Sequence, residues 1–178
     1  MRHAHSTYTP DELGRPLSER GFLDAHEVTG LLQNENIDHI VSSPYKRAIQ
    51  TVEGLAKYVD KKIEIVDGYK ERKLAEGAVE NFDLAIKKVW NDFDFAWEGG
   101  ESNHTAQKRG VDAIVQLIDQ FNGQNIVIST HGNIMVLIMN YFDPRYDFSF
   151  WEQLTMPDIY KLTFDSTQLI DVSRIWSP

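Results

Sequence analysis

The stretch Met1-Arg2-His3-Ala4-His5-Ser6, taken together with Thr130-His131-Gly132-Asn133, organises this chain. Each stretch has a histidine at a position where a strand is expected to end, and Arg2 stands beside the first of them. An arginine presents a planar fork of donors that matches phosphate oxygens. A histidine titrates near neutrality and can act as a nucleophile, an acid or a base. Two such stretches that meet in the fold would surround one phosphoryl group.

Composition indicates an ordinary globular domain. The chain has 178 residues, of which 42% are hydrophobic and 25% charged, which is enough to bury a core in a single domain over residues 1–178. No run of about 18 apolar residues is present, so no membrane span is expected. No secretory signal is visible. The chain has no cysteine, which excludes disulfides and thiolate chemistry and fits a cytoplasmic location.

The net charge narrows the classes of partner. Lys and Arg total 18 against 27 Asp and Glu, which gives a charge of −9. An acidic surface disfavours both nucleic acid and anionic lipid. Charge alone points to no substrate. The Arg and His residues quoted above favour a small phosphorylated substrate as the partner, and a homodimer is possible.

Alternating periodicities predict a three-layer α/β sandwich with a mostly parallel sheet. One helix starts at a Ser18 cap and a second at Ser43-Pro44. The expected helices span about 18–33, 43–59, 81–92, 103–121 and 134–141, the expected strands 38–42, 63–66 and 125–130, and a closing hairpin 159–164 and 169–175. Residues 71–102 are the least regular part and are expected to form an excursion or lid over the sheet.

The beginning of the chain is unusual for this architecture. If Arg2 and His3 end a strand, an apolar strand should precede them, and only Met1 does so. We therefore expect the first strand to be short or missing, through a truncated or misassigned N-terminus.

Three strand-to-helix junctions carry the chemistry. In open α/β sheets, ligands bind beyond the carboxyl ends of the strands. Arg47 lies in the first turn of its expected helix, and long helical side chains lean towards the N-terminus. The helix dipole also favours an anion there. Arg2, His3, Arg47 and His131 are thus expected to share one positive site.

These residues resemble the signatures of the histidine phosphatase superfamily, also called phosphoglycerate mutase-like. Ala4 replaces the usual glycine of the first signature, a change of one small residue for another. The matching stretches follow the family order over nearly the whole chain: Arg2-His3-Ala4-His5-Ser6, Ser43-Pro44-Tyr45-Lys46-Arg47-Ala48-Ile49-Gln50-Thr51, Glu71-Arg72 with Glu76-Gly77, Gly100-Glu101-Ser102, and His131-Gly132.

The resemblance implies a two-step phosphatase mechanism without metal or other cofactor. His3 would attack phosphorus and form a phosphohistidine that water hydrolyses. Arg2, Arg47 and His131 would hold the phosphoryl oxygens. Glu71 would protonate the leaving oxygen and later accept a proton from water.

Several assignments remain open at this stage. Asp67, Glu76 and Glu101 are alternatives to Glu71 as the proton donor. Four further residues are candidates for the edge of the site: His5, Ser6, Ser102 and Asn133. Ser43 could also line it, although capping explains a serine there. The aromatic run from Trp90 to Trp97 is either core, which we favour, or a lid that selects an apolar leaving group.

Three other functions compete with hydrolysis. A mutase of the same family would move phosphate between hydroxyls, but mutases generally carry longer insertions. A module that binds phosphorylated ligands without turnover would not need every catalytic residue. A metal hydrolase using His3, His5 and His131 would need a barrel of about 250 residues, more than this chain has.

Overall fold

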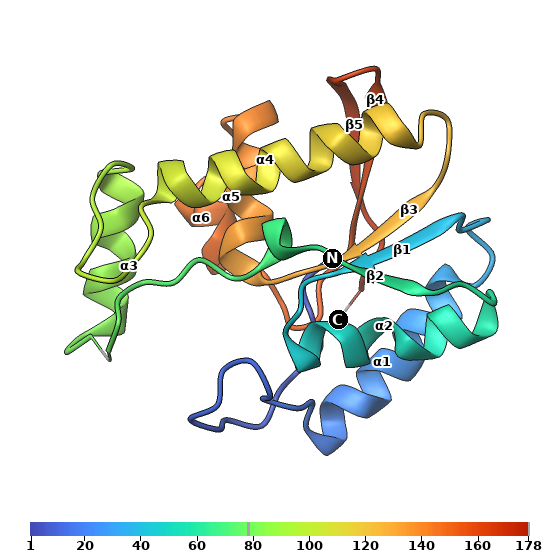
Figure 1. The fold of residues 1–178 in the computed structure, drawn as a ribbon, viewed down its shortest axis with the longest axis horizontal. Coiled ribbons are helices and arrows are strands. Elements are labelled where there is room, and N and C mark those ends of the chain that lie inside the picture. The colour runs from blue at the N-terminus through green and yellow to red at the C-terminus, as the bar shows by residue number, and fades with distance from the viewer. Residues whose placement is uncertain (78, 178) are drawn as a thin grey trace.

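The computed structural model describes residues 1–77 and 79–177 (Figure 1). Helices and strands alternate as expected. Their bounds are α1 Glu19–Leu32, β1 His39–Ser42, α2 Lys46–Tyr58, β2 Ile63–Ile65, the 3-10 helix η1 Asp67–Tyr69, α3 Phe82–Asn91, α4 Asn103–Gln120, β3 Ile126–Ser129, α5 Gly132–Phe142, α6 Phe148–Glu152, β4 Tyr160–Asp165 and β5 Gln168–Arg174. Within the described ranges, no helix is both long and apolar enough to cross a membrane.

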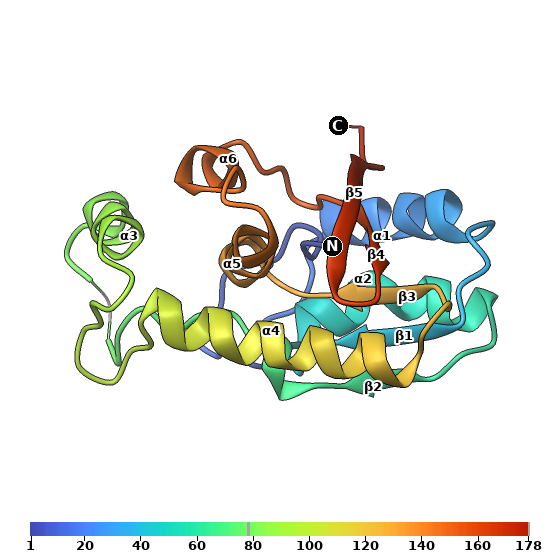
Figure 2. The same cartoon turned by 90° about the horizontal axis from the view of Figure 1, so that it is seen from above.

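A parallel sheet with strand order β2-β1-β3 forms the middle layer. Helices α1 and α2 cover one face, and α4 lies across the other (Figures 1 and 2). Successive residues of β1 serve the two cores: Ile40 packs with Val28 and Leu55, and Val41 packs with Ile114 and Ile134. This alternation follows from the two-residue side-chain period of a strand. The expected three-layer α/β sandwich is confirmed.

The first residues of the chain lie beside the end of β3. The Met1 carbonyl accepts from the Thr130 amide, and the His3 amide donates to the Thr130 carbonyl, each at 2.9 Å. On its other side, the Arg2 amide donates to the Asp158 carbonyl at 2.8 Å. These pairings are isolated bridges rather than a strand, as the expectation of a short or missing first strand implied. They hold His3 at the same sheet edge as His131.

A groove of about 470 Å³ lies between β3 and the β4–β5 hairpin. Its lining is largely apolar and includes side chains of Ile126, Ile128, Leu162 and Phe164. The hairpin itself is antiparallel, as expected, with Tyr160 paired with Arg174 at its open end. Residues of α4 and α5 also line the groove, and its lining includes Met1 and Thr130 but none of the residues proposed to carry chemistry.

Three predicted details are wrong. Helix α2 begins at Lys46, with Tyr45 as its N-cap residue, so Ser43-Pro44 precedes the helix instead of starting it. The sequence predicts that Phe22, Ala25, Thr29 and Leu32 form the buried stripe of α1, but Phe22 is 49% exposed and Val28 is buried. The short helix α6 was not expected, because its aromatic residues lack a helical period of useful length.

The excursion (residues 71–102) contains α3, which stands off from the sheet beyond the end of α4 (Figure 1). Its aromatic run packs as core: Trp90 is buried in the cluster that α4 and α5 share. Phe93, Phe95 and Trp97 pack against that cluster and remain partly exposed. The interpretation of these aromatic residues as core is therefore the correct one.

Candidate active site

Arg2, His3, Arg47 and His131, which we call the basic cluster, come from three junctions at one end of the sheet. His3 follows the bridged first residues, Arg47 lies in the first turn of α2 after β1, and His131 follows β3. The exposed fractions of His3, Arg47 and His131 are only 6%, 4% and 1%. The parallel register of β1 with β3 places the last residues of both strands, Ser42 and Ser129, side by side. The structure thus brings together the residues that the sequence placed at one site.

The hydrogen bonds of His3 define its tautomer. Nδ1 lies 2.7 Å from the Ala4 carbonyl oxygen, which can only accept, so Nδ1 carries the proton. Nε2 is then unprotonated, and its lone pair accepts a hydrogen bond from Nε of Arg47 at 3.2 Å. Burial, assisted by the charges of Arg47 and Arg2, lowers the pKa of His3 to about 3, although its bond to Ala4 opposes that shift. His3 is a neutral imidazole whose Nε2 lone pair points into the basic cluster.

His131 is held against His3 and the β1–α2 turn. Its ring centroid lies 5.1 Å from that of His3, in an edge-to-face arrangement. Nε2 lies 2.7 Å from the Ser43 hydroxyl oxygen, so Ser43 orients a proposed catalytic ring instead of capping a helix. Complete burial, with the His3 ring and the charge of Arg47 nearby, holds the pKa of His131 well below its usual range. The Tyr45 ring packs on the same imidazole, with 4.8 Å between centroids.

The Arg2 guanidinium lies against the beginning of α5. Its Nη1 donates to the carbonyl oxygens of Leu154 and Thr155, at 3.3 and 3.2 Å. A Cβ atom at position 132 would lie 3.1 Å from Nε of Arg2, closer than about nine in ten real Cβ contacts. A side chain at position 132 would therefore require the Arg2 side chain to shift by a few tenths of an ångström.

Arg47 is tied to the first stretch of the chain through Thr51. The Thr51 hydroxyl donates to the Arg47 carbonyl at 2.7 Å and accepts from the Ala4 amide at 3.0 Å. Arg47 also contacts Glu12, an exposed residue of the loop 7–16. Sequence reasoning assigned no role to Thr51 or Glu12. Thr51 lies in the second family signature, which was a signal for it, whereas no sequence signal pointed to Glu12.

Glu71 lies at the N-terminus of α5. Its carboxylate accepts from the amides of Asn133 at 3.1 Å, Ile134 at 3.0 Å and Arg72 at 2.8 Å. Burial lowers the pKa of both Arg2 and Arg47, and the nearby Glu71 charge opposes both shifts. Glu71 is thus fixed in orientation and close enough to the basic cluster to act on its arginines.

The three alternative carboxylates have other surroundings. Glu101 forms two hydrogen bonds with Arg109, at 3.0 and 2.9 Å. Asp67 pairs with Lys70 at 2.8 Å on the exposed surface. Glu76 is exposed on the excursion. Their placement favours Glu71 as the acid.

The four edge candidates separate into two groups. Asn133 is 4% exposed at the start of α5, where its Oδ1 accepts from Nε1 of Trp90 at 3.0 Å. The other three face local partners: His5 lies 2.8 Å from the Ser18 hydroxyl, Ser6 is bridged to Leu17, and Ser102 caps α4. Asn133 thus adjoins the basic cluster, and it also connects α5 to the excursion.

Several buried donors around the start of α5 have no hydrogen-bond partner in the described part of the chain. They are Nε of Arg2, Nε and Nη1 of Arg72 and Nδ2 of Asn133, and Nδ1 of His131 also lacks a partner there. Burying a donor without an acceptor is costly. An anionic ligand with several oxygens would supply the missing acceptors. Across residues 1–77 and 79–177, no three His, Cys, Asp or Glu side chains are grouped to hold a metal ion.

Three solved structures illustrate the similarity of fold. A phosphoserine phosphatase mutant from Entamoeba histolytica, in complex with phosphoserine, has a TM-score of 0.79 and 22% identity, covering 97% of this chain and 93% of its own. A mycobacterial glucosyl-3-phosphoglycerate phosphatase complexed with VO3 has a TM-score of 0.78 and 18% identity, covering 97% of this chain and 94% of its own. A putative alpha-ribazole-5'-P phosphatase from Escherichia coli has a TM-score of 0.77 and 19% identity, covering 99% of this chain and 94% of its own.

Sequence comparison gives a family for the whole domain. No curated protein matches the chain. The family profile of the histidine phosphatase superfamily (branch 1) matches residues 1–169, nearly the full length. The conserved order of the motifs, the fold and the profile agree, and the chain belongs to the histidine phosphatase superfamily.

Proposed function

We propose that this protein is a phosphatase that hydrolyses a phosphomonoester through a phosphohistidine on His3. The observation that carries the proposal is the geometry of His3, whose Nε2 lone pair faces the buried Arg47 guanidinium, with the buried His131 imidazole beside it. A neutral imidazole is the nucleophilic form. Because burial lowers the pKa of His3 to about 3, that form predominates at neutral pH.

In the first step, Nε2 of His3 attacks phosphorus and the bond to the ester oxygen breaks. Arg2, Arg47 and His131 hold the phosphoryl oxygens and stabilise the charge that spreads over them in the transition state. Glu71 delivers its proton to the leaving oxygen, which departs as an alcohol. The products are that alcohol and a phosphohistidine.

In the second step, water attacks the phosphohistidine and Glu71 takes its proton. The bond between phosphorus and Nε2 breaks, which regenerates neutral His3 and releases inorganic phosphate. The guanidinium groups provide the positive charge that Mg²⁺ provides in other phosphoryl-transfer enzymes. We therefore propose that the reaction is independent of metal, and EDTA should leave the rate unchanged.

The test uses p-nitrophenyl phosphate and a ³²P-labelled phosphoester. His3→Ala should lower kcat/KM by about 10³-fold or more, because the residue that forms the covalent intermediate is lost. It should also abolish the ³²P label that the wild-type protein retains after rapid acid-free quenching. His26→Ala, at an exposed position on α1, is the matched control and should retain both.

Two outcomes would replace this proposal. Isomerisation of 3-phosphoglycerate that depends on a bisphosphate primer would indicate a mutase. Tight binding of phosphoesters without turnover or label would indicate a binding module. The ligands in two solved structures of the same fold, phosphoserine and VO3, favour phosphate chemistry but leave the identity of the ester open.

A further inference from the structure

All three guanidinium nitrogens of Arg47 already have partners within the chain. Nε donates to Nε2 of His3 at 3.2 Å. Nη1 donates to the backbone carbonyl of Glu12 at 2.8 Å, and Nη2 lies 3.3 Å from Oε2 of the same residue. A phosphate that reaches Arg47 therefore finds one N–H of each nitrogen engaged, and it competes with the Glu12 carboxylate for the guanidinium charge.

The two partners in this ion pair differ in burial. The Arg47 side chain is 5% exposed, whereas that of Glu12 is 56% exposed. Glu12 lies in the loop 7–16, which is closed by a hydrogen bond from the Thr7 amide to the Pro16 carbonyl, and it also pairs with Arg15. The Glu12 carboxylate regains hydration when it turns into water, because its own side chain is already more than half exposed. Arg47 would then be left buried without an anion.

The charge of Glu12 also affects the pKa of Arg47. Burial lowers the pKa of Arg47, and Glu12 is the largest influence that opposes the shift. The guanidinium therefore needs an anion, and Glu12 supplies one from outside the basic cluster. A phosphomonoester carries more negative charge than one carboxylate and offers oxygens to several donors together.

We propose that Glu12 is the resident anion of Arg47, which substrate phosphate must displace and which returns when product phosphate leaves. This inference rests on the proposed function of the basic cluster as a phosphate site. Glu12 then sets the apparent affinity for phosphate, since that affinity is the intrinsic one multiplied by the fraction of molecules in which Arg47 is free. It limits the binding of substrate and of product to the same extent.

Glu12→Gln tests the proposal because glutamine keeps the size of the side chain and the backbone carbonyl that accepts from Nη1. Binding of inorganic phosphate and of vanadate is measured by calorimetry. We expect both dissociation constants to fall about threefold to fivefold, the range that an exposed ion pair supports. Inhibition of p-nitrophenyl phosphate hydrolysis by inorganic phosphate should become stronger by the same factor.

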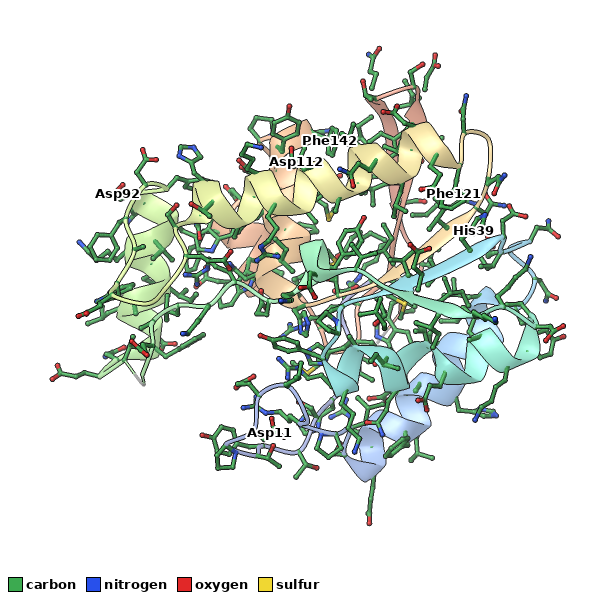
Figure 3. The ribbon with its side chains drawn as sticks, viewed as in Figure 1. Asp11, His39, Asp92, Asp112, Phe121 and Phe142 are labelled. Atoms are coloured by element: carbon green, nitrogen blue, oxygen red, sulfur yellow. The ribbon has the colours of Figure 1, made fainter. Side chains whose placement is uncertain are left out.

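Asp11→Asn is the matched control. Asp11 is the neighbouring acidic residue of the loop, and its Oδ1 accepts from the Gly14 amide instead of contacting Arg47. Figure 3 labels Asp11, which shows where this loop lies. The loop is well separated from α3, whose end is marked by the label of Asp92. The control removes one negative charge from the same loop and should leave both dissociation constants unchanged. An equal effect in both variants would reduce the result to general surface charge and overturn the proposal.

Weaker binding in Glu12→Gln would show that Glu12 positions Arg47 for phosphate, and unchanged binding would show that it has no effect; either result overturns the inference. Thermal unfolding confirms that the variant folds.

Hydrogen exchange on the wild-type protein gives a second measurement: phosphate should increase exchange of the amides in residues 7–16, and unchanged or slower exchange would contradict displacement. Since phosphate binding is measured directly, tighter binding in a protein without phosphatase activity would refute the proposed function and leave this inference standing.

Discussion

The basic cluster and the excursion represent two different ways of building this molecule. Residues of the basic cluster are buried, apart from the half-buried Arg2, and the cluster is held by contacts more than 40 positions apart, such as His3 with Arg47 and Ser43 with His131. The excursion packs on the core through Trp90, yet its outer side is open, and Phe82 and Leu84 on α3 are 55% and 65% exposed. Its connections to the cluster are the Glu71 carboxylate and the hydrogen bond from Trp90 to Asn133.

This difference suggests a division of labour. A buried cluster with fixed partners is suited to stabilise one charge distribution, that of the phosphoryl group in its transition state. A partly exposed segment tied to it at two points can vary without disturbing the chemistry. We expect substitutions in the cluster to lower kcat, and substitutions in the excursion to have small or substrate-dependent effects.

Arg47→Lys should cause the largest loss among the following changes. A lysine keeps the charge but has no planar fork, so it cannot contact both His3 and two phosphoryl oxygens. We expect kcat/KM for p-nitrophenyl phosphate to fall about 10²-fold or more. Arg20→Lys on α1, where the arginine side chain is 77% exposed, is the control. A loss of less than about threefold would show that Arg47 does not contact the transition state.

Glu71→Gln examines the boundary between the two regions. If Glu71 protonates the leaving oxygen, the loss should be about tenfold greater for an alkyl phosphate than for p-nitrophenyl phosphate, whose leaving group needs no proton. Equal losses for both substrates would indicate that Glu71 only orders the start of α5. Glu76→Gln, in the same excursion, should affect neither substrate.

The burial of two neutral imidazoles predicts that acid destabilises the protein. The pKa of His3 is about 3 in the folded protein, against about 6.5 when unfolded, so between these values only the unfolded chain binds the proton. The free energy of unfolding should therefore fall as the pH drops from about 6.5 towards 3, by up to about 1.4 kcal/mol per pH unit from this residue. Denaturant titrations between pH 7 and 5 measure the slope. In His3→Asn it should be smaller, and an unchanged slope would contradict the buried neutral state.

Trp90→Phe should produce the smallest effect. Phenylalanine keeps the aromatic packing on α4 and α5 but loses the donor to Oδ1 of Asn133. We expect kcat/KM to change by about twofold to fivefold, the range of one neutral hydrogen bond. Trp97→Phe, at the other tryptophan of the excursion, is the control and should have no effect. A loss approaching that of Arg47→Lys would erase the distinction between cluster and excursion.

Helix and strand periodicity predicted most of the elements to within a few residues, because their buried faces repeat regularly along the chain. The β1–α2 turn was less predictable. Ser43-Pro44 has the composition of a helix start, yet the helix begins at Lys46 and Ser43 instead contacts His131. Local propensity was overridden there by a partner 88 positions away, which no local pattern contains.

Taken alone, the sequence determined the family, the order of the layers and the identity of the four basic side chains, since these depend on motifs and on hydrophobic period. Only the tertiary structure decided that Glu12 pairs with Arg47, that Thr51 joins α2 to Ala4 and that Glu71 accepts from the first amides of α5. Each of these is a hydrogen bond between segments distant in the chain. Such contacts follow from how the strands align, and one-dimensional spacing carries no record of that alignment.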